Sequence, residues 1–423
     1  MKVSLYRCFC FAFLCSMAWD IFYMNGIGRM LDYLAFVILI ILFLFSSDND
    51  HHESNPIASY MYISIFILLL IGLQSLVRTD PQAIKSYFGF CMGISSYFLV
   101  RKLNFLPNFY FFRNVICFLF FFQFVQLVTF IISGHYVDFS ALTGGVPSRG
   151  VNETVSVLFL RSSSIYQEPN GYAVTLLFLF SLFTATASNS LRYRSTSQFL
   201  YTYLLVCFSL ISSGSIFGII SSLCLSFLIA FYFILSILVR RSIRWNHVSQ
   251  SLFLKLVFAS CSVAFFVICI SEILSTILEI AFKRLTLIDS DASALARFQV
   301  NSDLLSFLST ESLHHIFFGN GLTTYDGTFQ LFLGANCYSF LLYSVGIFGF
   351  LCLLLFSYTP IFSFRSKMLL FSTEPSLLGY FPIAVVFLCL TLSLFTWPLY
   401  TYQFYWIFLG ILHNAFSSKS FYK

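Results

Sequence analysis

Apolar runs long enough to cross a membrane follow one another along almost the whole chain. Only 9% of the residues are charged and 59% are hydrophobic, whereas a soluble globular domain usually carries about 25% charged residues. Because so few charges cannot cover a water-soluble surface of this size, lipid must cover it. The apolar runs are continuous and show no alternation, so they predict helices rather than a closed barrel. We therefore expect an all-α polytopic integral membrane protein.

The apolar runs divide into about twelve transmembrane helices, each of which needs about 20 residues to cross the hydrocarbon core. No domain-sized soluble region separates them, so residues 1–423 are expected to form one multi-pass membrane domain. The boundary between the seventh and eighth spans is placed at Ser213-Gly214-Ser215, and the boundary between the last two spans at Trp397-Pro398. The expected spans are residues 6–24, 30–46, 58–77, 84–100, 109–132, 170–188, 198–213, 215–239, 252–274, 336–357, 378–396 and 399–413.

Arginine and lysine are distributed unevenly between the two sides that these spans define. If the N-terminus is cytoplasmic, the short outer loops contain only Arg29 and Arg78. Short loops rich in Lys and Arg stay in the cytoplasm, so we expect cytoplasmic termini and two long periplasmic loops, residues 133–169 and 275–335. Loops of this length are usually functional. The inner short loops and the tail contain Arg101, Lys102, Arg192, Arg194, Arg240, Arg241, Arg244, Arg365, Lys367, Lys419 and Lys423.

The cysteine, histidine and acidic residues do not predict a metal site. The 12 cysteines include no C-x-x-C pair and lie almost entirely in apolar runs, where cysteine is a small apolar residue. Asp289-Ser290-Asp291 has the D-x-D form that nucleotide-sugar transferases use to hold a divalent cation, but such a pair is more often a solvated turn or a helix cap. His314 and His315 are adjacent, so on a helix their side chains diverge by about 100°. We expect no metal and no cofactor.

The first long loop ends in a polar sequence that leads into a helix. Arg161 precedes three serines, and Glu168-Pro169-Asn170 follows them. Proline suits the first turn of a helix, and a negative charge is favoured there. On residue types alone, a capped helix start with Arg161 reaching the membrane interface is the simpler interpretation. A binding site for a polar substrate is the other.

The second long loop carries further polar residues in front of a helix. Asp291 predicts the start of a short helix that runs to about Leu308. His314-His315 is followed by Phe318-Gly319-Asn320-Gly321, and Asn336 precedes the next apolar span. A histidine in this place acts as a base or a hydrogen-bond donor, or it simply lies at the membrane interface.

The order of these short motifs forms a recognisable pattern. The motifs are Arg-Ser-Ser-Ser-x-x-x-Glu-Pro-Asn from Arg161, Ser-Gly-Ser from Ser213, Ser-Ala-x-x-Arg-Phe from Ser293, Phe-Gly-x-Gly from Phe318, and a final motif with Asn336, Leu342, Gly346 and Gly349. This order resembles the bacterial O-antigen polymerase family (Wzy-type), within the O-antigen polymerase/ligase superfamily. The likeness covers residues 161–349, and elsewhere it consists only of topology. Ligases of the superfamily usually have His-Asn where this chain has Ala335-Asn336, which favours the polymerase.

The resemblance implies a glycosyltransferase of lipopolysaccharide O-antigen biosynthesis in the bacterial inner membrane. Such an enzyme transfers a growing glycan from undecaprenyl pyrophosphate onto a lipid-linked repeat unit at the periplasmic face. The donor already carries a good leaving group, so the reaction needs no nucleotide, metal or cofactor. The expected partners are undecaprenyl-pyrophosphate-linked oligosaccharide, the lipid bilayer and a chain-length regulator protein, with no nucleic acid.

The resemblance and the residue chemistry together assign candidate roles. Arginine donates bidentately to phosphate, so Arg161 and Arg297 are candidates for binding the donor pyrophosphate. A base must accept the proton of the acceptor hydroxyl, and Glu168, His314 and His315 all remain candidates for it. The candidates for contacts with sugar hydroxyls are Asn320, Tyr325 and Asn336.

Two other functions fit part of the same pattern. An O-antigen ligase, which transfers finished glycan to lipid A core, would share the donor and the fold. A flippase or transporter of lipid-linked oligosaccharide is the alternative from another class. Transporters usually show internal repeats and charged or broken helices near the midplane, whereas the polar residues here gather in the outer loops. This distribution favours chemistry at the membrane surface.

Overall fold

In the residues that it describes, the computed structural model is all-α apart from one antiparallel pair of short strands. The structure describes residues 2–17, 27–45, 56–77, 81–133, 162–166, 168–187, 196–241, 309–322, 325–326, 331–332, 336–371, 377–396 and 399–417, and the single positions 137, 139, 300, 304 and 306.

The N-terminal part of the bundle consists of α1 (Lys2–Met17), α2 (Ile27–Phe45), α3 (Pro56–Val77), α4 (Pro81–Leu103) and α5 (Phe109–Ser133). Both α3 and α4 begin with proline, whose missing N–H costs nothing in the first turn. α4 ends before Asn104, which has φ 47° and donates its N–H to Val100 O at 3.2 Å. A left-handed residue directly after a helix is a common way to end it.

A tight turn separates α8 (Thr196–Ser212) from α9 (Ile216–Arg241). Gly214 adopts φ 61°, a conformation that glycine enters without steric cost. Ser215 Oγ then accepts the N–H of Gly218 at 2.9 Å, which caps the first turn of α9. A Cβ on Gly218 would lie 2.5 Å from Leu210 O, so the two helices approach closely here. The predicted division at Ser213-Gly214-Ser215 is confirmed.

The second long loop contains α13 (Leu313–Phe318) and an antiparallel pair of strands, β1 (Tyr325–Asp326) and β2 (Leu331–Phe332). It leads into α14 (Cys337–Phe371), which the sequence predicts as an unbroken span. Instead, α14 is interrupted at Gly346, which has φ 66° and ψ −175°. The predicted helix from Asp291 to about Leu308 lies largely outside the described residues.

The centre of the bundle is formed by α7 (Pro169–Ala187) and α16 (Gln403–Ser417). Every residue of α7 is buried, and α16 is buried from Gln403 to Phe416. Phe178 stacks on Phe408 and Phe404, with ring centroids 4.3 and 5.7 Å apart. The segment before α16 contains α15 (Leu377–Ser393) and the 3₁₀-helix η7 (Leu399–Thr401).

Most described helices lie within a few residues of the predicted spans, and span 252–274 lies outside the described residues. Two differ: α14 is interrupted at Gly346 and continues to Phe371, and the last predicted span begins with η7, so that α16 starts only at Gln403. In the described part of the chain, four stretches are long and apolar enough to cross a membrane: Ala83–Leu103, Phe109–Phe130, Pro169–Ala187 and Cys337–Phe362. Several shorter helices are also apolar. Large apolar side chains face outward, for example Phe227 at 75% and Leu44 at 72% exposed. This combination fits a multi-pass membrane protein.

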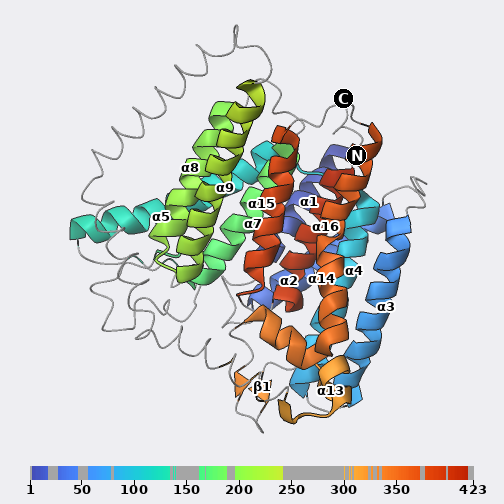
Figure 1. Cartoon of the computed structure of the whole chain (residues 1–423). Helices are drawn as coiled ribbons and strands as arrows, with labels where there is room; N and C mark the ends of the chain where they lie inside the picture. Colours follow the sequence, from blue (N-terminus) through green and yellow to red (C-terminus); the bar gives the residue numbers. More distant parts are fainter. Residues whose placement is uncertain are drawn as a thin grey trace.

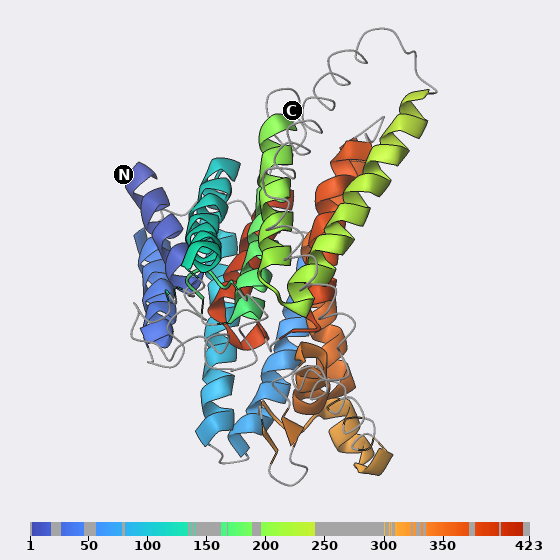
Figure 2. The same ribbon diagram turned by 90° about the vertical axis from the view of Figure 1, so that its left-hand side faces the viewer.

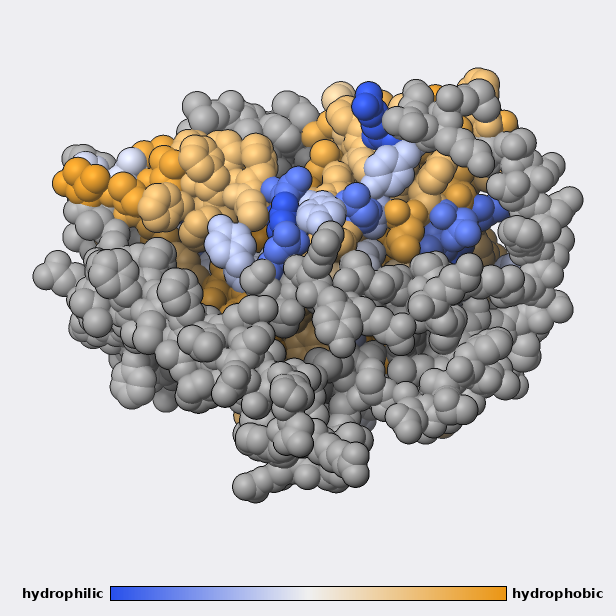
Figure 3. All heavy atoms as spheres, turned by 90° about the horizontal axis from the view of Figure 1, so that it is seen from above, coloured by the Kyte–Doolittle hydropathy of each residue, from blue (hydrophilic) through white to orange (hydrophobic). Residues whose placement is uncertain are grey.

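The two ends of the bundle differ. The beginning of α1 and the end of α16 lie at one end, and α13 and β1 lie at the other (Figures 1 and 2). Arg101 and Lys102 close α4, and Arg240 and Arg241 close α9, at the end that holds the beginning of α1. Figure 3 looks onto this end and shows hydrophilic side chains set among apolar ones. We call it the terminal end, and the opposite one the α13 end.

Candidate functional site

The serines that follow Arg161 are buried rather than exposed. Ser162, Ser163 and Ser164 have exposed fractions of 0%, 1% and 0%. Ser162 Oγ donates to Ser212 O at 2.5 Å, and Ser164 Oγ donates to Leu119 O at 2.7 Å. Buried hydroxyl groups need such partners because an unmade hydrogen bond is costly there. The serines therefore fix the end of the first long loop inside the helix bundle.

Gln123 of α5 joins this serine segment to α8 and α7. Its side-chain nitrogen donates to Ser162 Oγ at 2.8 Å, to Ser212 Oγ at 2.9 Å and to Ser209 O at 3.0 Å. Its side-chain oxygen accepts the hydroxyl of Tyr172 at 2.9 Å. Two N–H groups are thus shared among three acceptors. The residue is completely buried, and it connects the serine segment to the end of α8, directly before the Ser-Gly-Ser motif.

Gln126, one turn further along α5, holds the backbone of the same segment. Its side-chain oxygen accepts the N–H of Ser164 at 2.9 Å, and its side-chain nitrogen donates to Ser164 O at 2.9 Å. The same nitrogen also donates to Val137 O at 3.1 Å, so it ties the start of the first long loop to its end. Sequence analysis missed both glutamines. The pattern that could have identified them is a pair of polar side-chain amides, three residues apart, inside a span rich in phenylalanine.

Glu168 is the residue directly before α7. Its carbonyl oxygen accepts the N–H of Tyr172 at 3.1 Å, the first bond of the helix. The predicted helix start at Glu168-Pro169 is confirmed, and the half-buried Glu168 lies at the positive end of α7. Arg161, which comes directly before the fixed serine segment, lies outside the described residues, as does Arg297.

The Phe-Gly-x-Gly motif packs against the interruption of α14. Gly319 and Gly321 adopt φ 81° and 92°. A Cβ on Gly319 would overlap the carbonyl group of Ser344, and a Cβ on Gly346 would overlap the carbonyl group of Phe317. Both positions therefore require glycine. Gly319 and Gly321 thus form a tight turn after α13.

Hydrogen bonds join the same two segments. Asn320 N donates to Tyr343 O, and Gly321 N donates to Ser344 O, both at 2.9 Å. Helix carbonyls become available to such partners where the chain departs from the helix at a kink. The turn and the kink therefore stabilise each other, and they bring the last two motifs of the pattern together.

Asn320 is buried within this turn, with an exposed fraction of 8%. Its side-chain nitrogen has no hydrogen-bond partner in the part of the chain that the structure describes. An unpaired buried donor costs about 1–3 kcal/mol. Gln74 at the end of α3 lies beside the turn, with its amide nitrogen 3.3 Å from the carbonyl oxygens of Phe318 and Gly319 when oriented as a donor.

Asn336 and Tyr325, the other two candidates for sugar contacts, lie on either side of the second strand. Asn336 is buried and forms the cap of α14, where its carbonyl oxygen accepts the N–H of Phe340 at 3.1 Å. Its side-chain nitrogen donates to the hydroxyl of Tyr338 at 3.4 Å. Tyr325 lies in β1, opposite Phe332.

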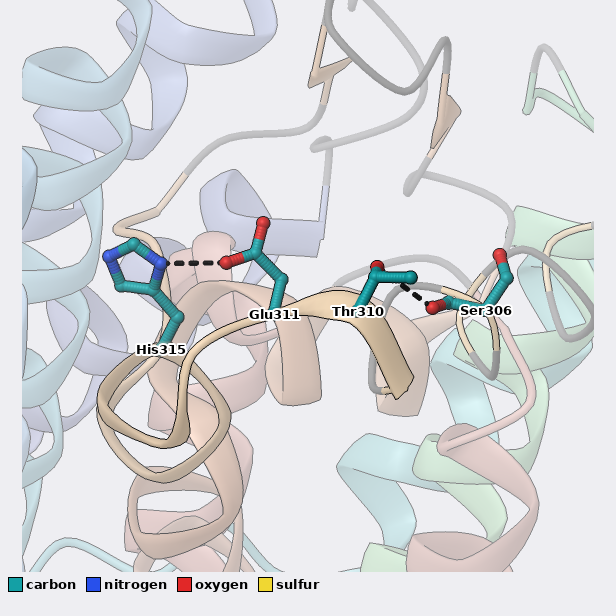
Figure 4. Close-up of polar contacts among 4 residues, drawn as sticks. All are labelled: Ser306, Thr310, Glu311 and His315. Carbon is teal, nitrogen blue, oxygen red and sulfur yellow. Dashed lines mark hydrogen bonds and ion pairs between the residues drawn. The ribbon is translucent and has the colours of Figure 1, made fainter.

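His315 of α13 forms an ion pair or hydrogen bond with Glu311. His315 Nδ1 lies 2.9 Å from Glu311 Oε2, and the two side chains are 45% and 21% exposed. The two side chains point toward each other in Figure 4. When Nδ1–H donates to the carboxylate, Nε2 keeps its lone pair and accepts a proton. Sequence analysis missed Glu311, although the four-residue spacing to a histidine was visible.

His314 differs from its neighbour. Its ring lies against Phe318, with centroids 5.3 Å apart. Glu168 lies directly before α7, whereas the two histidines belong to α13. Among the described residues, no group of three or more His, Cys, Asp and Glu side chains could hold a metal ion.

Comparison with known proteins adds no family. No protein-family model matches the chain, and no curated protein is similar to it at a significant level. The function is therefore inferred from the motifs and from the geometry of the two motif pairs.

Proposed function

We propose that this chain is an O-antigen polymerase, a glycosyltransferase that extends lipid-linked glycan at the periplasmic face of the bacterial inner membrane. The observation that supports this proposal best is the pairing of the motifs. Ser162, the first serine of the Arg-Ser-Ser-Ser motif, bonds Ser212 directly and through Gln123, and Ser212 comes directly before the Ser-Gly-Ser turn. The Phe-Gly-x-Gly turn contacts the α14 kink through Asn320 and Gly321. If these motifs form one binding site, hydrogen bonds between them would keep their side chains in fixed positions toward the substrate.

In the proposed reaction the acceptor hydroxyl oxygen forms a bond to the anomeric carbon of the donor glycan. The bond between this carbon and the pyrophosphate oxygen breaks, and undecaprenyl pyrophosphate leaves with the electron pair. Arg161 and Arg297 would balance the charge of the pyrophosphate. The fixed serine segment supports the role of Arg161, because a rigid neighbour limits where the guanidinium can go.

The hydroxyl proton must pass to a base, and the geometry favours His315 among the three candidates. Only His315 combines an imidazole with a carboxylate at 2.9 Å among the described residues. Glu311 would hold the ring and stabilise its charged form after proton transfer, as a carboxylate does beside a catalytic histidine. Asn320, Tyr325 and Asn336 would then contact sugar hydroxyls. The amide nitrogen of Asn320, which has no partner among the described residues, supports this role best.

The proposed orientation has the terminal end in the cytoplasm. The basic residues that close α4 and α9 lie there, as the positive-inside rule requires. The α13 end would then face the periplasm, where lipid-linked repeat units are joined. A chain-length regulator protein remains the proposed partner in the membrane.

The gene should be deleted in its own host and the lipopolysaccharide separated on a gel, with the wild-type gene restored as control. Core bearing one repeat unit, with the ladder lost, is the expected result. Core without any repeat unit, together with lipid-linked polymer, would instead identify a ligase. Unpolymerised lipid-linked units that accumulate on the cytoplasmic side would identify a flippase.

A further inference from the structure

A pocket with a volume of about 440 Å³ opens between α5 and α8 and is distinct from both motif pairs. It is lined by Arg113, Asn114, Cys117, Gln198 and Tyr201. Its volume falls within the range of about 300–1,000 Å³ that is typical of small-molecule sites. Arg113 is the fifth residue of α5 and Gln198 the third residue of α8. The pocket therefore lies near the start of both helices.

Arg113 is held in place inside this pocket. Its Nη2 donates to Asn114 Oδ1 at 3.2 Å, and its guanidinium lies 5.0 Å from the centre of the Tyr110 ring. These contacts orient the planar group and, among the described residues, leave its other N–H donors available. An oriented guanidinium is well suited to bind phosphate. The start of each helix adds a partial positive charge nearby.

Gln198 contributes a hydrogen-bond acceptor to the pocket, whereas Arg113 contributes donors. Its side-chain oxygen is shielded from solvent and has no hydrogen-bond partner among the residues that the structure describes. The terminal torsion of a glutamine side chain is soft, so this oxygen can turn into the pocket that the residue lines. A ligand with an N–H donor would satisfy it. A charged donor would form the stronger hydrogen bond.

Further along α5 and α8 from the pocket, both helices have exposed apolar side chains. Phe118 and Phe121 on α5 are 55% and 59% exposed. Tyr201 lines the pocket, and Leu204 lies one turn further along α8, 37% exposed. In a membrane-spanning chain this surface faces hydrocarbon, so a ligand with its charged part at Arg113 can lay its chains over it.

We propose that this pocket binds the headgroup of phosphatidylethanolamine from the leaflet at the terminal end. The lipid phosphate pairs with Arg113, the ammonium group donates to Gln198 Oε1, and the acyl chains cover the exposed rings of α5. The proposal is independent of the activity proposed for the outer loops. Phosphatidylcholine is the natural control lipid, because its trimethylammonium group has a positive charge but no N–H.

The test is native mass spectrometry of the purified full-length chain in detergent, with phosphatidylethanolamine, phosphatidylcholine and phosphatidylglycerol of matched acyl chains added in equal amounts. The wild type should retain phosphatidylethanolamine about tenfold more than phosphatidylcholine, since one charge-assisted hydrogen bond separates the two. Arg113→Gln should lower the binding of both by about tenfold. Gln198→Leu should lower phosphatidylethanolamine to the level of phosphatidylcholine and leave phosphatidylcholine unchanged.

Two further variants keep the test decisive. Gln198→Glu retains the acceptor and should preserve or strengthen the preference, even if the leucine variant does not fold. Lys102→Gln changes a basic residue on another helix, in the groove between α2 and α4, and should change nothing. Equal retention of the two zwitterionic lipids by the wild type would overturn the proposal. So would undiminished binding to Arg113→Gln, or stronger retention of phosphatidylglycerol, whose headgroup donates only hydroxyls.

Discussion

Gly319 and Gly346 meet backbone to backbone, so that neither position has room for a side chain. One belongs to the turn after α13 and the other interrupts α14, and both have positive φ angles. The contact explains why two short glycine motifs, separated by a strand pair, occur in one chain. It also couples the second long loop to a helix of the bundle.

Replacing Gly346 by alanine should therefore destabilise the protein. The new Cβ would overlap the carbonyl group of Phe317, and a non-glycine residue at φ 66° adds about 1–3 kcal/mol of strain. Thermal unfolding of the purified protein in detergent measures the effect. Gly89→Ala is the matched control, since its Cβ would meet only Thr401 O at 3.5 Å. A melting temperature that falls equally in both variants would contradict this explanation.

Gln123→Leu should cost about 1–3 kcal/mol, because it leaves buried hydroxyls without their partner. The loss should also reduce polymer length in cells, since the serine segment beside Arg161 keeps only its direct bond from Ser162 to α8. Thr129→Val on the same helix is the control, because the Thr129 hydroxyl bonds only to carbonyls of its own helix, at Val125 and Gln126. Protein amount, unfolding temperature and the lipopolysaccharide ladder are measured together. An unchanged ladder with a folded Gln123→Leu protein would show that this contact of the serine segment is not needed for polymer formation.

His315→Gln should lower polymer formation about 10²–10⁴-fold, as expected for loss of a general base. Glu311→Gln should also lower it, by a smaller factor, because the imidazole keeps its place but loses its charged partner. His314→Gln is the neighbouring control and should retain most activity. The measurement is polymer formed per amount of folded protein in membranes supplied with lipid-linked repeat units. If Glu168→Gln is inactive while His315→Gln stays active, the base is Glu168 and not His315.

Asn320→Leu should separate stability from activity. Removing a buried amide nitrogen that has no partner among the described residues costs little stability or increases it, while the backbone bond from Asn320 to Tyr343 remains. If the amide nitrogen serves a sugar hydroxyl, polymer formation should fall at least tenfold. Unfolding temperature and polymer formation are compared in the same preparation. A stable variant with full activity would remove Asn320 from the proposed site.

Neutral replacements of the two loop arginines should abolish polymer formation without loss of protein. Arg161→Gln and Arg297→Ala remove the charge that would balance the donor pyrophosphate, whereas Arg161→Lys keeps the charge but not the bidentate geometry. The lysine variant should therefore recover only part of the activity. Full activity in Arg297→Ala would exclude its role in binding the donor.

Most of the helices could be predicted from the sequence because lipid imposes long apolar runs. The α8–α9 turn was also predictable, since Gly214 lies between two serines that cap well. The kink at Gly346 was not, because glycine is tolerated in a membrane helix and the need for positive φ comes from Phe317 and Gly319, which lie in another element.

The polar connections of the candidate site were harder to foresee than its motifs. Gln123 and Gln126 lie inside an apolar span, and a sequence does not tell which distant groups an amide will meet. Their partners come from the first long loop and from α8. The pairing of Glu311 with His315 is local, so its spacing alone was a usable signal.

The complete burial of α7 has a consequence for how the protein is made. α16, which packs against it, is synthesised long after α7 has left the ribosome. Until then α7 must be surrounded by lipid or lie beside the insertion machinery. Its hydroxyl groups allow this, because Thr175, Ser181, Thr184 and Thr186 all donate to carbonyls of their own helix. The hydroxyl of Tyr172 donates to Gln123 of α5, which is synthesised before α7. α7 can therefore enter the membrane early and acquire its neighbours late, without exposing an unpaired hydroxyl to hydrocarbon.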